Sequence, residues 1–70
     1  MIPFIATVSD KHLGKTGFIA ARLTNEHGCR ITMVRDTIGF IMGESPVPLE
    51  DIKKSVEGIE IEPDGEVKKS

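Results

Sequence analysis

The sequence contains no tryptophan and no tyrosine, and its aromatic residues are three phenylalanines. The missing residues are among those on which single-stranded nucleic acids most often stack, and they are also the most common anchors of protein interfaces. We therefore expect a core built from aliphatic side chains, methionine and phenylalanine. A nucleic-acid partner is not favoured.

Cysteine is also scarce, since Cys29 is the only one in the sequence. Neither an intramolecular disulfide nor a cysteine-based zinc site can form from it alone. No N-terminal stretch has the charged-then-apolar pattern of a signal peptide. No apolar run approaches a length of about 20 residues, which a bilayer-spanning helix needs. These absences favour a soluble cytoplasmic protein without a membrane partner, and no cofactor is expected.

The charges that are present divide unevenly along the chain. Residues 1–43 contain five Lys or Arg and three Asp or Glu, whereas residues 44–70 contain four and eight. The first part is therefore +2 and the second −4. Such a bipolar domain can pair with itself or with a partner through surfaces of opposite charge. Two ordinary solvated surfaces are the alternative interpretation.

Alternating apolar residues predict four strands, over residues 2–8, 29–35, 38–42 and 59–62. In the second of these, Cys29, Ile31 and Met33 are expected to point inward, and Phe40 in the third is expected in the core. The clearest amphipathic helix follows the prolines at 46 and 48, because Leu49, Ile52 and Val56 recur at helical spacing. Gly58 is expected to end that helix.

Residues 17–27 are ambiguous between helix and strand. In the helix interpretation Thr16 is the N-cap and Gly28 takes the left-handed position at the end. In the strand interpretation all apolar residues share one face, but Arg22 then lies opposite Arg30, a like-charge pair. We prefer the helix.

Both interpretations predict an α+β fold for a single domain of residues 1–63, with a solvated tail over 64–70. The helix gives the element order β-α-β-β-α-β of the ferredoxin-like arrangement, with an antiparallel sheet and two helices on one face. The strand interpretation of residues 17–27 predicts a β-meander with one helix and a closing strand.

The segment from Ser9 to Thr16 follows a predicted strand and matches the pattern G-x-x-x-x-G-K-[ST] except at Ser9. In that pattern backbone N–H groups, a lysine and a hydroxyl hold phosphate oxygens. An anion-binding corner is therefore expected at Gly14, Lys15, Thr16 and Gly17. The stretch resembles the first strand-loop-helix of P-loop nucleotide-binding proteins, and residues 28–34 resemble the strand that follows there. A plain β–α loop with an N-cap explains the same residues.

Residues 17–24, together with His27 and Gly28, also resemble the first helix of ACT regulatory domains. That resemblance implies a ferredoxin-like fold and the binding of small effectors, often amino acids, at paired interfaces.

Acidic residues cluster near the C-terminal end, where Glu60, Glu62 and Asp64 fall on one strand face and its turn. Weak binding of a divalent cation such as calcium is one interpretation of this cluster, and a solvated face is the other. No serine has an obvious histidine and acid partner in the sequence. We therefore expect a non-enzymatic binding, regulatory or assembly module that forms a homodimer or binds a protein partner. Weak ion binding, by a cation or by an anion, is the alternative.

Overall fold

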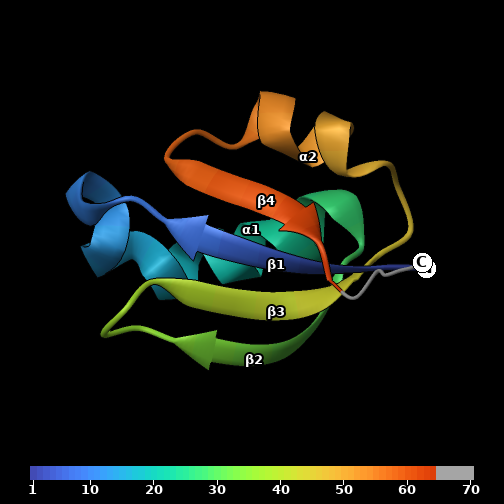
Figure 1. Ribbon diagram of the computed structural model, residues 1–70. Coiled ribbons are helices and arrows are strands. Elements are labelled where there is room, and N and C mark those ends of the chain that lie inside the picture. Colours follow the sequence, from blue (N-terminus) through green and yellow to red (C-terminus); the bar gives the residue numbers. More distant parts are fainter. Residues whose placement is uncertain (65–70) are drawn as a thin grey trace.

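A computed structural model describes residues 1–64 of the chain, and Figure 1 shows the arrangement of its elements. The predicted tail over 64–70 lies, apart from Asp64, outside the described residues. The elements follow one another as β1 (Ile2–Val8), the 3-10 helix η1 (Asp10–Lys15), α1 (Thr16–His27), β2 (Arg30–Arg35), β3 (Phe40–Ser45), α2 (Leu49–Ser55) and β4 (Ile59–Pro63).

The four strands form one sheet in the order β2-β3-β1-β4, and all neighbouring strands are antiparallel. Because β1 and β2 both run antiparallel to β3, they run parallel to each other on either side of it. The α+β class, with four antiparallel strands and two helices, is confirmed. The meander alternative is wrong, because Thr16–His27 forms a helix.

The two ends of α1 show one confirmed and one failed prediction. Gly28 follows the helix with φ of 70°, the left-handed conformation that glycine adopts without a steric penalty. Thr16, in contrast, is not the N-cap but the first helical residue, and it is 1 % exposed. Its hydroxyl donates to the carbonyl of Leu13 at 2.7 Å. The hydroxyl therefore joins η1 to α1 instead of accepting from the helix N-terminus.

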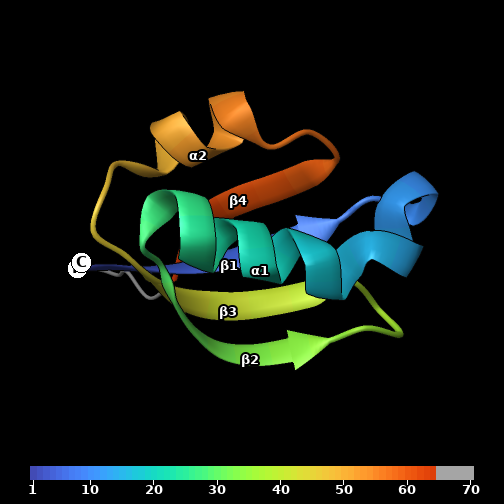
Figure 2. The same cartoon turned by 180° about the vertical axis from the view of Figure 1, so that it is seen from behind.

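Both helices contribute apolar side chains to one core on one face of the sheet, although Phe18 of α1 is 64 % exposed. Figure 2 shows α1 lying across that face, with α2 beside β4. Ile52 and Val56 are both buried, but only Ile52 lies in α2, because the helix ends at Ser55 and Val56 follows it in an extended conformation. The prediction that Gly58 ends this helix is therefore wrong. The core cluster comprises Phe4, Ala6, Val8, Ile19, Ala20, Leu23, Cys29, Ile41, Ile52, Val56, Ile59 and Ile61.

The hairpin of β2 and β3 departs from the predicted pattern. A register shift between Ile31 and Met33, typical of a β-bulge, places Met33 opposite Met42 and Val34 opposite Ile41. The prediction that Met33 points inward is therefore wrong, since one inserted residue moves the following side chains to the other face. Met33 is 39 % exposed.

The start of β3 also differs from the prediction. The strand begins at Phe40, and Ile38 lies in the preceding turn with 63 % of its surface exposed. Gly39 ends the turn with φ of 68°, and its carbonyl accepts a hydrogen bond from the amide of Val8 at 2.7 Å. Phe40 is half-buried and is not a member of the core cluster, contrary to expectation.

Candidate functional site

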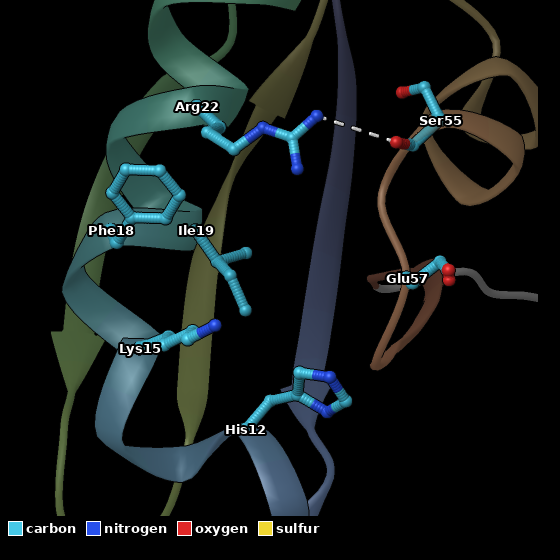
Figure 3. Close-up of a pocket in the computed structure, with 7 residues that line it drawn as sticks. All are labelled: His12, Lys15, Phe18, Ile19, Arg22, Ser55 and Glu57. Carbon is cyan, nitrogen blue, oxygen red and sulfur yellow. Dashed lines mark hydrogen bonds between the residues drawn. The ribbon is translucent and has the colours of Figure 1, made fainter.

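One candidate site is a hollow of about 340 Å³ between the first half of α1 and the segment that joins α2 to β4. Figure 3 shows its lining side chains. Three basic or titratable nitrogen groups come from η1 and α1, and a serine and a glutamate come from the opposite wall. The lining residues are His12, Lys15, Phe18, Ile19, Arg22, Ser55 and Glu57.

Arg22, at one end of the hollow, is already paired within its own helix. Its Nε donates to Oε2 of Glu26 at 3.0 Å, and its Nη2 donates to Oε1 at 3.1 Å. These hydrogen bonds, reinforced by the opposite charge, raise the pKa of Arg22 and lower the pKa of Glu26. Nη2 also reaches the carbonyl oxygen of Ser55 at 3.5 Å, drawn as a dashed line in Figure 3. Arg22 therefore helps to connect α1 to the end of α2.

Lys15 and His12 supply the other two nitrogen groups of the hollow. In Figure 3 both side chains extend toward the same space beside Ile19. Nδ1 of His12 shares a hydrogen bond of 2.9 Å with the hydroxyl of Ser9. Among residues 1–64, no carboxylate lies within salt-bridge distance of Lys15. The ammonium group of Lys15 is thus available to an anion from solution.

The structure divides the predicted anion-binding corner. Lys15 lines the hollow described above, whereas Gly14, Thr16 and Gly17 line a separate hollow of about 310 Å³ that also contains Asp36. The carboxylate of Asp36 opposes the binding of an anion in that second hollow. The segment is also not an open loop, since η1 occupies Asp10–Lys15. A 3-10 helix directs its N–H groups along its axis, as when the amide of Thr16 donates to Leu13, and not toward a common phosphate.

Two serine–histidine pairs escaped prediction from the sequence. Ser9 contacts His12 through the bond already described, and the hydroxyl of Ser55 lies 2.7 Å from Nε2 of His27. Each of these two serines therefore has a histidine partner in the fold that the sequence did not reveal. The second pair joins residues 28 positions apart, which only the packing of α2 beside α1 brings together. Within residues 1–64 neither histidine forms a salt bridge with a carboxylate, so no triad is assembled.

The acidic cluster lies on and beside β4. Glu60 and Glu62 are exposed and share one face of the strand, opposite Thr7 and Ile5 of β1. The amide of Asp64 donates to the carbonyl of Pro3 at 2.9 Å, which continues the pairing with β1. In the part of the chain that the structure describes, no three His, Cys, Asp or Glu side chains are grouped so as to hold a metal ion.

A second candidate site is the sheet face opposite the helices, which we call the open face and which is turned toward the viewer in Figure 1. The strand register orders its side chains in rows across the sheet. The middle row runs Met33, Met42, Ile5, Glu62, and the next row runs Arg35, Phe40, Thr7, Glu60. Neither helix packs on these residues, and Ile5, Phe40 and Met42 are half-buried.

The charges of these rows are separated between the two edges of the open face. Strand β2 carries Arg30 and Arg35 on this face, whereas β4 carries Glu60 and Glu62, and all four side chains are exposed. Glu44 of β3 lies beside Arg30, so the separation is sharpest in the row that runs from Arg35 to Glu60. The face therefore has a hydrophobic centre, a positive edge and a negative edge.

Comparisons with known proteins place no further constraint on either site. No protein-family model, no curated protein and no solved structure matches this chain. The similarities to P-loop proteins and to ACT domains therefore stay predictions from the residues alone. Among the described residues, no helix has the length and apolar content needed to cross a bilayer.

Proposed function

We propose that this chain is a non-enzymatic binding and assembly module that binds a protein through the open face of its sheet. The observation that supports this proposal is the partly exposed apolar strip formed by Ile5, Met42 and Phe40. Interfaces commonly combine such an apolar centre with a charged rim. Met33 extends the strip to β2, and methionine adapts to the shape of a partner because its side chain is unbranched and flexible.

Photo-crosslinking tests this proposal directly. A photoreactive amino acid at Thr7 places the probe on the open face, and the same amino acid at Lys54 places it on α2, away from that face. We expect position 7 to capture a protein that mass spectrometry identifies, either a second copy or another chain. The purified partner should bind the wild-type chain and not Met42→Glu. Equal capture from positions 7 and 54 would contradict the proposal.

The hollow beside α1 supports a second candidate function, the binding of a small inorganic or organic anion. It rests on the shared direction of the Lys15 and His12 side chains and on the absence of a carboxylate near Lys15 in residues 1–64. Glu57 in the opposite wall and Glu26 beside Arg22 reduce the positive potential, so we expect weak binding.

Titration with inorganic phosphate, followed by amide chemical shifts, tests the second candidate. We expect shifts confined to the residues around the hollow, and their loss in Lys15→Gln. Lys11→Gln is the matched control, because Lys11 belongs to η1 but does not line the hollow. Shifts spread over the whole surface, or retained in Lys15→Gln, would contradict a site at this position.

A further inference from the structure

We infer that the partner of the open face is a second copy of this chain, related by a two-fold axis that runs parallel to the strands. The inference rests on the proposed function, because it uses the same surface and specifies its occupant. The two edges of the face carry opposite charges, Arg30 and Arg35 on β2 and Glu60 and Glu62 on β4. A face of this kind is complementary to itself once it is turned over.

The direction of the axis follows from the strand order β2-β3-β1-β4. A two-fold axis parallel to the strands, lying between the two faces, places β2 of one copy over β4 of the other and β3 over β1. An axis across the strands would place β2 over β2 and β4 over β4, which brings charges of the same sign together. Only the first arrangement pairs opposite charges at both edges.

The register then identifies the contacts. Arg35 and Glu60 belong to one row, through Phe40 and Thr7, so each Arg35 faces Glu60 of the other copy. In the middle row, Met42 of each copy faces Ile5 of the other copy, so this contact occurs twice, once on each side of the axis. The apolar contacts therefore lie at the centre and the ion pairs at the two rims, as in an isologous interface.

Pairing through the free edges of the sheet is less favourable for two copies. Antiparallel pairing of β2 with β2 about its centre sets Arg30 against Arg35, and pairing of β4 with β4 sets Glu60 against Glu62. Like charges directly opposite each other destabilise a strand pair. The register shift in β2 further interrupts that edge. Pairing β2 with β4 would not close and would build a chain of subunits.

The size of the face predicts a weak dimer. Four strands about 4.8 Å apart and five residues at about 3.4 Å each cover roughly 300 Å² per copy in projection. Two copies would bury on the order of 600 to 1,000 Å², the range of transient interfaces. We expect a dissociation constant between about 10 µM and 1 mM.

Charge reversal and sedimentation equilibrium test the dimer and its geometry together. Arg35→Glu and Glu60→Arg should each weaken self-association at least about tenfold, because each sets like charges opposite each other at both rims. An equimolar mixture of these two variants should restore association, since both contacts of the mixed dimer then pair opposite charges. Lys54→Glu, which changes the net charge as Arg35→Glu does but lies on α2, should leave association unchanged. Circular dichroism verifies that each variant is folded.

Several results would overturn the inference. These are a wild-type chain that stays monomeric up to about 1 mM, a dimer indifferent to both reversals, a mixture that fails to associate, or an equal effect of Lys54→Glu. An oligonucleotide that binds the monomeric open face would overturn it as well. A monomeric chain whose position 7 captures a different protein would remove self-association but leave the proposed function in place. Failure of that crosslinking too would remove both.

Discussion

The two faces of the sheet are built from the same strands but differ in how far their side chains are buried. On the covered face, side chains of β1, β3 and β4 meet α1 and α2 and are nearly all inaccessible to solvent. On the open face, neighbouring positions of the same strands are half-buried or exposed, and several of them are charged. Since successive residues of a strand point to opposite faces, one residue step separates a position that stabilises the fold from a position available for binding.

The largest expected effect contrasts two adjacent residues of β3. Ile41 is fully buried on the covered face, whereas Met42 is half-buried on the open face. Ile41→Ala should lower the free energy of unfolding by about 2 to 5 kcal/mol, because it removes buried methyl groups and leaves a cavity. Met42→Ala should cost below about 1.5 kcal/mol. Urea denaturation followed by circular dichroism at low protein concentration measures both, and equal losses would contradict the difference between the faces.

Glycine substitutions provide a second contrast of intermediate size. A Cβ at Gly43 would collide with the carbonyl oxygen of Arg30 and lie 3.1 Å from Cα of Ile31, both in the backbone of β2. Gly43→Ala should therefore destabilise the protein by about 1 to 3 kcal/mol. A Cβ at Gly17, near the start of α1, would in contrast meet no heavy atom within 4 Å outside its own helix and its neighbours in the chain.

Gly17→Ala is thus the matched control, and it should stabilise the fold by about 0.4 to 1 kcal/mol because alanine restricts the unfolded chain. Thermal unfolding of the two variants shows directly whether each substitution raises or lowers the melting temperature. A neutral Gly43→Ala would show that the packing between β2 and β3 is looser than described, and a destabilising Gly17→Ala would contradict the open space found beside the start of α1.

Thiol reactivity distinguishes the faces without a change in stability. Cys29 is 3 % exposed, and burial raises the pKa of its thiol, so the reactive thiolate is disfavoured at neutral pH. A cysteine placed at Thr7 lies exposed on the open face. We expect a water-soluble disulfide reagent to modify Cys29 roughly 100-fold more slowly than the cysteine of Thr7→Cys. Comparable rates would indicate that the covered face opens readily.

The smallest expected effect concerns the ion pair on the outer surface of α1. The Arg22 hydrogen bonds lower the pKa of Glu26 in the folded state, so the pair stabilises the fold above the unfolded pKa of the carboxyl. That contribution is lost as the pH falls through the folded pKa. Glu26→Gln should therefore lower the melting temperature slightly at neutral pH and leave it unchanged in strong acid, where the carboxyl is protonated in both states. A larger decrease in melting temperature in acid than at neutral pH would contradict the expected pH dependence.

Local sequence patterns predicted the elements better than the side-chain directions. The spacing of Leu49 and Ile52 predicted α2, although the helix ends at Ser55, before Val56 and Gly58. Gly28 predicted the end of α1. Nothing in the residues around Thr32 indicated the register shift, because a bulge is decided by the pairing with β3. Met33 was consequently assigned to the wrong face.

The candidate sites likewise combine residues that a local sequence pattern indicated with residues that only the fold brings together. The near-match from Ser9 to Thr16 placed Lys15 in one corner with Gly14, Thr16 and Gly17, but the pattern could not foresee that Lys15 would line a different hollow from Gly14 and Gly17. The residues across the hollow, Ser55 and Glu57, belong to a distant segment of the chain. No local signal connects them to Lys15.

By itself, the sequence determined the α+β class, the aliphatic core and the uneven distribution of charge, because composition and periodicity act within short segments. Only the tertiary structure decided that the positive residues of β2 and the negative residues of β4 lie on the two edges of one uncovered face. Strand order and register depend on contacts between distant segments, and those contacts decide which charges can meet a partner.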